Sequence, residues 1–203
     1  MLIIAIILLG MPYILLGVYG LVIACYGSGM KGINGDPKPS GHDLPHVYIV
    51  TCFHDEEAIL PRKIENLRNL NYPKLSFIFV DDHSSDGSFQ IVQSVADERT
   101  VLMKNKSRGK TEGQNMALEH IPSGSIVVFN DCNVFLDKEC IWHIVESYRH
   151  GVGGVVGNVS IFESEGKKGI EGLHWEYEKK IKMLESDFGS VIGFDGGFYS
   201  LRS

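Results

Sequence analysis

Along residues 46–203, short apolar runs of strand length alternate with stretches in which apolar residues recur at helical spacing. The four runs cover residues 47–53, 76–81, 100–103 and 125–130. After the first run, Leu60, Ile64 and Leu67 mark one buried helix face. Continuous apolar runs of this length are typical of strands buried on both faces. The alternation predicts an α/β fold with a mainly parallel sheet and helices on both of its faces.

The pattern continues beyond the fourth run. Asp137 is predicted to cap a helix in which Ile141, Ile144, Val145 and Tyr148 follow helical spacing. A Gly- and Val-rich strand is expected over residues 152–162, and a longer helix over residues 170–184. The Gly-rich residues 189–203 follow, and we assign no element to them.

The chain begins with a long uncharged segment, because residues 2–26 contain no charged side chain. At a rise of about 1.5 Å per residue, a helix of this length exceeds the ~30 Å hydrocarbon core of a bilayer. We therefore predict a transmembrane helix over residues 1–28. The alternative is a cleaved signal peptide, which calls for a basic start and a small-residue cleavage site.

Residues 29–45 are rich in Gly, Pro, Ser, Asn and Asp, which predicts a linker between the membrane and a folded domain over residues 46–203. Lys31 and Lys38 follow the apolar segment, whereas no Lys or Arg precedes it. The positive-inside rule then favours a cytoplasmic domain. We expect a membrane protein with one N-terminal span and its folded domain in the cytoplasm.

Polar side chains gather where the strands are predicted to end. The second run stops on Asp81 and Asp82, and Ser85 or Asp86 can cap a following helix. The carboxyl ends of parallel strands form the edge at which open α/β sheets bind ligands. The acidic pair is therefore expected in a ligand-binding crevice.

The fourth run leads directly into Asp131-Cys132-Asn133. A carboxylate and an amide oxygen two residues apart can hold Mg²⁺ or Mn²⁺, with the remaining positions going to water and ligand phosphates. Taken alone, such an Asp-x-Asn pair is more often a turn. The basic turn around Gly109 and Lys110, before a predicted helix, is a candidate seat for an anion, although it is not a Walker loop.

Composition removes several classes of function. The formal net charge of -6 argues against nucleic acid as a partner, because that ligand needs a basic face. The 4 cysteines show neither a Cys-x-x-Cys pair nor a histidine at zinc spacing, so neither a zinc site nor a disulfide framework is indicated.

Together these residues resemble the family 2 glycosyltransferases of the GT-A fold, the group that includes cellulose, chitin and hyaluronan synthases. The resemblance covers about residues 47–202. It is carried by residues 52–57, by residues 80–88 (Val-Asp-Asp-His-Ser-Ser-Asp-Gly-Ser), by Gly109-Lys110 with Asn115, by Asp131-Cys132-Asn133, and by residues 193–202. This chain has Cys52, Asp55 and Asn133 where the family motifs have Pro, Asn and Asp.

The resemblance implies a Rossmann-like GT-A domain that moves a sugar from a nucleotide-diphosphate sugar donor to a glycan, polysaccharide or lipid acceptor, with inversion. It implies that Asp55, Glu57 and Asp82 recognise base and ribose, that Lys110 lies near the diphosphate, and that Asp131 and Asn133 hold a divalent metal, Mg²⁺ or Mn²⁺. The general base of the family is expected beyond Ser203. The catalytic residue is therefore unassigned, the acceptor half of the domain is expected to be cut short, and this chain alone is expected to transfer little sugar.

Two other classes of function stay open. A phosphoacceptor receiver domain also carries an acidic pair like Asp81 and Asp82, with a phosphorylated Asp about where Asp131 falls. Against it, a strand and a helix precede the acidic pair here, and Lys179 and Lys180 lie inside a helical pattern instead of ending a strand. The other possibility is a relative that binds sugar nucleotides without turning them over.

Overall fold

The computed structural model describes residues 44–148, 151–159, 170–191, 193 and 196–203. In chain order its elements are β1 (Val47–Phe53), α2 (Leu60–Arg68), β2 (Leu75–Asp81), α3 (Ser88–Val95), β3 (Thr100–Lys104), α4 (Lys110–Leu118), β4 (Ile126–Asn130), α5 (Cys140–Ser147), β5 (Gly154–Val156), α6 (Ile170–Phe188) and β6 (Phe198–Arg202). The chain divides into two compact units, and α6 belongs to a different unit from the sheet and its helices.

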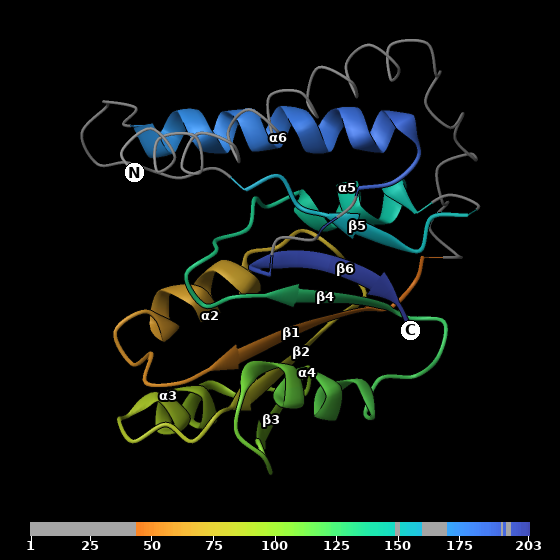
Figure 1. Ribbon diagram of the computed structural model, residues 1–203. Coiled ribbons are helices and arrows are strands. Elements are labelled where there is room, and N and C mark those ends of the chain that lie inside the picture. The colour runs from red at the N-terminus through yellow and green to blue at the C-terminus, as the bar shows by residue number, and fades with distance from the viewer. Residues whose placement is uncertain (1–43, 149–150, 160–169, 192, 194–195) are drawn as a thin grey trace, which may run out of the picture. The chain divides into compact units, whose positions relative to one another are not determined.

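The sheet has 6 strands in the order β3-β2-β1-β4-β6-β5 (Figure 1). β3, β2, β1 and β4 are parallel neighbours, whereas β6 runs antiparallel to both β4 and β5. The chain first winds from β1 outward to β3, and then returns to place β4 on the other side of β1. The strand order thus reverses between β1 and β4, and such a switch point opens a crevice outside the carboxyl ends of the strands.

Apolar side chains cover both faces of the parallel strands. One cluster joins Val47 and Ile49 of β1 to buried residues of α2, α3 and α5. The other joins Val50 of β1 to Met116 and Ala117 of α4. Fully burying a Val, Leu or Ile side chain contributes about 1.5–3 kcal/mol. The predicted mainly parallel sheet with helices on both faces is therefore confirmed.

The boundaries of β1 are as predicted, and those of β2, β3 and β4 differ from prediction by one residue. The prediction for Asp137 is wrong, because α5 begins two residues later than an Asp137 cap requires, with Glu139 at the N-cap. Asp137 Oδ1 instead accepts the Glu139 N–H at 2.9 Å. The predicted strand over residues 152–162 is shorter, since β5 covers only Gly154–Val156 and residues 160–162 lie outside the described part.

Strand β6 was not predicted, and it makes the sheet mixed and not purely parallel. Its five residues pair with β4 along their whole length, from Phe198 opposite Asn130 to Arg202 opposite Ile126. The Gly-rich stretch before Phe198 signals a turn, and the strand itself is too short to show a period. Its pairing partner lies some seventy residues earlier in the chain, so the contact that creates it is tertiary.

The predicted transmembrane helix over residues 1–28 and most of the linker over residues 29–45 lie outside the described residues. Among the residues that are described, none of the helices combines the length and the apolar character needed to cross a membrane.

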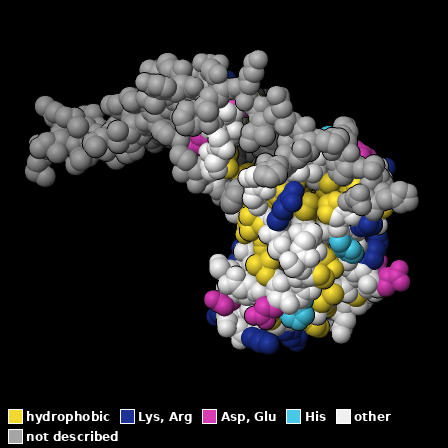
Figure 2. Space-filling view, turned by 90° about the vertical axis from the view of Figure 1, so that its right-hand side faces the viewer, with side chains coloured by type: hydrophobic (Ala, Val, Ile, Leu, Met, Phe, Trp, Pro, Cys, Tyr) yellow, Lys and Arg dark blue, Asp and Glu magenta, His cyan; other side chains and the backbone are white. Residues whose placement is uncertain are grey.

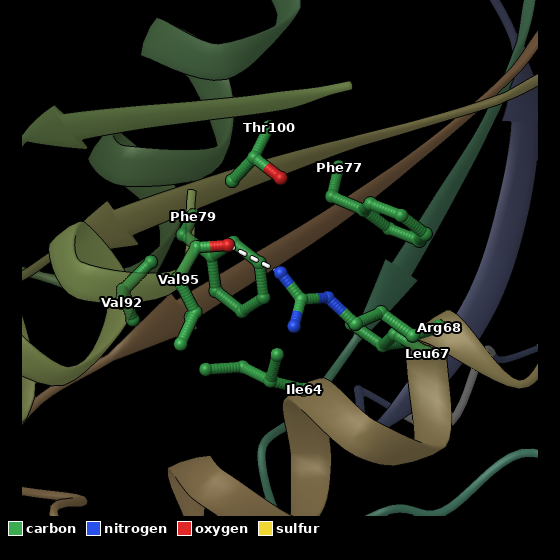
Figure 3. Close-up of a pocket in the computed structure, with 8 residues that line it drawn as sticks. All are labelled: Ile64, Leu67, Arg68, Phe77, Phe79, Val92, Val95 and Thr100. Carbon is green, nitrogen blue, oxygen red and sulfur yellow. Dashed lines mark hydrogen bonds between the residues drawn. The ribbon is translucent and has the colours of Figure 1, made fainter. Parts of the chain in front are cut away.

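A small cavity lies between the helices α2 and α3 and the strands β2 and β3 (Figure 3). The Arg68 guanidinium points across it and donates a hydrogen bond to the Val95 carbonyl at the end of α3. The cavity measures about 10 Å³, whereas a single water molecule needs about 10–15 Å³. It is therefore a packing defect of the core, too small to be a ligand site.

Figure 2 views the molecule from the right-hand side of Figure 1, where the parallel strands begin and the C-terminus lies. Among the described side chains on this face, basic, acidic and histidine residues are mixed with hydrophobic ones and do not gather into one basic patch. The described part of this face therefore lacks the basic patch that a polyanion would need.

Candidate functional site

A polar cleft of about 250 Å³ opens at the carboxyl ends of β1 and β4, at the switch point of the sheet. It is lined by the last two residues of β1, by residues that follow β1, β2 and β4, and by the first residue of α4: Cys52, Phe53, His54, Glu56, Asp82, Lys110, Asp131, Cys132 and Asn133. The structure thus brings together Asp82, Lys110, Asp131 and Asn133 from three separate segments of the sequence.

Asp55 and Glu57 do not line this cleft. The Asp55 carboxylate accepts the Ser85 N–H at 2.6 Å and the Asp86 N–H at 3.3 Å, and Glu57 Oε2 accepts the Gly87 N–H at 2.8 Å. Both carboxylates therefore tie the loop after β1 to the loop after β2 and to the start of α3. Their role in base and ribose recognition stays a prediction.

Two residues that we had not singled out line the cleft instead, namely His54 and Glu56. The alternation of β1 does not continue past Phe53, because Asp55 takes a left-handed backbone conformation (φ 51°). This conformation turns the chain, so neighbouring side chains no longer point to the faces that a strand pattern predicts. The His54 ring contacts the second loop through the Asp82 carbonyl, with Nδ1 at 2.8 Å.

Asp82 organises the start of α4. Its carboxylate accepts the Gly109 N–H on both oxygens at 3.0 Å and the Asn105 amide at 2.9 Å. Burial by itself would raise the pKa of Asp82, but the hydrogen bonds from Gly109 and Asn105 outweigh it and hold the pKa below its ordinary value. Asp82 is therefore ionised at neutral pH, and it fixes the residue immediately before Lys110.

Gly109 supplies the backbone conformation that this arrangement needs. Its φ of 116° lies in the region that residues with a Cβ avoid. The conformation turns the Gly109 N–H toward Asp82 and lets α4 begin at Lys110. The helix packs closely on the sheet at Gly113, because a Cβ added there would lie only 3.2 Å from Cys52 Sγ and from Val80 Cγ1.

Lys110 reaches across the cleft to the loop after β4. Its ammonium lies 2.5 Å from Asp131 Oδ1 and donates to the Gly196 carbonyl at 2.7 Å. The Asp131 N–H in turn donates to the Gly197 carbonyl at 3.0 Å. Lys110 and Asp131 therefore join α4, β4 and the turn before β6 at one point.

The charges of the cleft suit an anionic ligand that binds together with a divalent cation. Among the lining residues, three carboxylates (Glu56, Asp82 and Asp131) face one lysine, Lys110. No group of three or more His, Cys, Asp or Glu side chains within the described ranges could cage a metal without help. Asp131 and Asn133 offer two hard oxygen donors beside a lysine, which fits Mg²⁺ or Mn²⁺ that takes its other ligands from water and phosphates.

Cys52 and Cys132 also line the cleft, but they are poor nucleophiles. Burial raises the pKa of each thiol to about 12. Because the thiolate is the reactive form, both side chains act here as small apolar groups.

The acidic pair of the receiver hypothesis is split by the structure. Asp81 ends β2 as a buried residue whose Oδ1 accepts the Ser84 N–H at 3.0 Å, and only Asp82 reaches the cleft. Two carboxylates are therefore not presented side by side to a metal near Asp131. The antiparallel β6 beside β4 also departs from the wholly parallel sheet that the receiver reading needs.

The fold and the cleft define a Rossmann-like α/β domain with a polar ligand site at its switch point. Residues 48–203 match the family described as Glycosyl transferase family 2, so the chain belongs to this family. Its domain is a glycosyltransferase domain, and this membership settles the question against the receiver class.

Individual relatives are more distant. The chain is 26% identical over 162 residues to the GalNAc(5)-diNAcBac-PP-undecaprenol beta-1,3-glucosyltransferase of Campylobacter jejuni, which covers 78% of this chain and 52% of the relative. It is 24% identical over 166 residues to the poly-beta-1,6-N-acetyl-D-glucosamine synthase of Staphylococcus aureus, which covers 79% of this chain and 37% of the relative. The chain thus spans about half the length of the first relative, or less in the second.

Among solved structures, the mannosyltransferase PcManGT from Pyrobaculum calidifontis, in complex with GDP-Man and Mn²⁺, is similar with a TM-score of 0.73 and 20% identity. The match covers 98% of this chain and 55% of that protein. At this identity the likeness supports the fold, a GT-A-like mixed α/β domain.

Proposed function

We propose that this chain is the donor-binding part of a membrane-anchored, inverting glycosyltransferase that moves a sugar from a nucleotide-diphosphate sugar to a glycan, polysaccharide or lipid acceptor. The observation that carries the proposal is the pairing of Lys110 with Asp131, beside Asn133, at the switch point of a family 2 domain. The relatives named above act, by their names, on lipid-linked or polysaccharide substrates.

In the proposed reaction, Lys110 binds the diphosphate and Asp131 and Asn133 hold the cation that accompanies it. A bound Mg²⁺ or Mn²⁺ would neutralise charge that develops on the departing diphosphate. Asp82 keeps Lys110 in place through Gly109. Asp55 and Glu57 hold the two loops that form one wall of the cleft. We assign no general base among residues 1–203.

If Asn133 is a metal ligand, one substitution should change the nucleotide affinity in opposite directions with and without the metal. Replacing Asn133 by Asp adds a carboxylate to the metal pair, so the affinity for UDP or GDP is expected to rise several-fold with Mn²⁺ and to fall with a chelator, where only repulsion remains. Asn133→Ala should lower the affinity with Mn²⁺ and leave it unchanged with the chelator. Isothermal titration calorimetry measures all four values. If Asn133→Asp changes the affinity equally in both conditions, Asn133 is not a metal ligand.

The proposed membrane anchor rests on the uncharged residues 2–26. Moving so long an apolar segment into water is costly, so the chain should stay with membranes during alkaline carbonate extraction. Deleting residues 1–30 should release the domain into the soluble fraction. Full-length chain that is recovered without detergent in the supernatant would contradict the anchor.

A further inference from the structure

Lys63, in α2, is a charged side chain that lies completely inside the protein, with 0% of its surface exposed. It belongs to the apolar stripe of the helix, between Leu60 and Leu67, one position before Ile64. Burial lowers its pKa to about 8. Because removing an ammonium group from water is expensive, a buried lysine is stable only where hydrogen-bond acceptors surround it.

The acceptors of Lys63 bracket the predicted metal-binding turn. Its ammonium donates to Asn130 Oδ1 and to the Val134 carbonyl, the latter at 2.5 Å. Asn130 is the residue before Asp131, and Val134 is the residue after Asn133. The Asn130 amide also donates to the Val134 carbonyl at 3.3 Å. Lys63 therefore links the two ends of the turn from the protein interior, while Asp131 and Asn133, inside the turn, line the cleft.

The next turn of the same helix holds the segment that follows. The Asn66 side chain donates to the Leu136 carbonyl at 2.8 Å and accepts the Leu136 N–H at 2.9 Å. Two polar side chains three residues apart, on the face of α2 that meets this loop, thus set the path of residues 130–136. Asn66 makes its contacts with a neutral amide, whereas Lys63 makes its contacts with an ammonium group.

Stability alone gives a weak reason for that charge. A buried ion is often no more stabilising than a well-packed apolar residue of the same volume. A metal site, however, needs its ligands held in place before the cation arrives, and the residues that orient those ligands contribute substantially to metal affinity. Lys63 hydrogen-bonds to the residues on both sides of the turn and to neither predicted ligand. This is the position expected of a residue that orients metal ligands without binding the metal.

We infer that Lys63 is a positioning residue that holds Asp131 and Asn133 at the spacing needed to bind a divalent cation together with a nucleoside diphosphate. The inference rests on the proposed function, because it needs the cation at this turn. Lys63 touches neither donor nor acceptor in this role, and acts only through the backbone and side chain of Asn130 and the backbone of Val134.

The test compares UDP or GDP binding with Mn²⁺ and with a chelator for the wild-type chain in mild detergent, Lys63→Met, and Leu67→Ala. Leu67 is 1% exposed on the same helix and does not take part in the hydrogen bonds of Lys63 to Asn130 and Val134, so Leu67→Ala controls for loss of stability. Loss of a residue that orients ligands typically costs about 10–100-fold in metal affinity. We expect Lys63→Met to reduce the Mn²⁺-dependent gain at least about tenfold, with nucleotide affinity in chelator unchanged, and Leu67→Ala to keep the full gain at a temperature where both variants are folded.

A Lys63→Met variant that keeps the full gain would overturn the inference, and so would an equal loss in Leu67→Ala. If Lys63→Met does not fold, Lys63→Gln takes its place, since it keeps a donor but not the charge. A several-fold loss in Lys63→Gln supports the inference, and an undiminished gain overturns it. A wild-type chain without any Mn²⁺-dependent gain would contradict the proposed function itself, and this inference with it.

Discussion

Replacing Asp131 by alanine is expected to abolish the metal-dependent part of nucleoside diphosphate binding. The side chain contributes the only carboxylate of the proposed metal pair, and its Oδ1 lies 2.5 Å from the Lys110 ammonium. Without it a cation would have one neutral ligand, Asn133, so the gain in affinity from Mn²⁺ should fall at least about tenfold, equivalent to about 1.4 kcal/mol. In chelator the affinity should hold or rise, because Lys110 is released and a negative charge is removed.

Two further variants make this result specific. Asp131→Asn keeps the shape of the side chain and leaves the Asp131 N–H bonded to the Gly197 carbonyl, so it should lose the metal gain without disturbing the turn. Asp97→Asn removes a carboxylate from the turn before β3, where it binds Arg99 and Thr100 outside the cleft, and should keep the gain. Retention of the full gain in either Asp131 variant would remove Asp131 from the metal role.

The largest loss of stability is expected from Gly157→Ala. A Cβ at this position would lie 1.6 Å from the ring of Phe198, which is buried at the start of β6. Overpacking of this kind typically costs about 1–3 kcal/mol. At about 2–4 °C per kcal/mol, the melting temperature should fall by about 2–12 °C. The displacement also threatens the cleft, because Gly197, next to Phe198, accepts the Asp131 N–H.

Gly153→Ala provides the matched control, because no atom lies within 4 Å of the Cβ that it would add. Its melting temperature should stay close to that of the wild type, as measured by differential scanning calorimetry. Equal melting temperatures for the two variants would show that Gly157 and Phe198 are not in contact as described.

The central sheet could be predicted from the sequence because its information is local. The apolar run at Val47–Phe53 is bounded on both sides by polar residues, so its ends are visible without a structure. The carboxyl ends of parallel strands necessarily share one edge, which is why Asp82 and Asp131 could be placed together.

The missed features depend on contacts between distant segments. β6 forms only because β4 offers it an edge. Asp55 and Glu57 bind the backbone of a loop that follows another strand, and a sequence pattern does not reveal whether a carboxylate faces a ligand or a neighbouring loop. Lys63 did leave a signal, since a lysine interrupts the apolar stripe of Leu60, Ile64 and Leu67, but its partners lie in the loop after β4.

The most direct test of the account is crystallographic. Crystals of the domain grown with UDP or GDP and Mn²⁺ should show, in anomalous difference maps, one Mn²⁺ peak at about 2.0–2.6 Å from oxygens of Asp131 and Asn133, with the diphosphate between that peak and Lys110. The nucleotide should lie in the cleft between the ends of β1 and β4. A nucleotide bound elsewhere, or bound in this cleft with Mn²⁺ away from Asp131, would contradict the account.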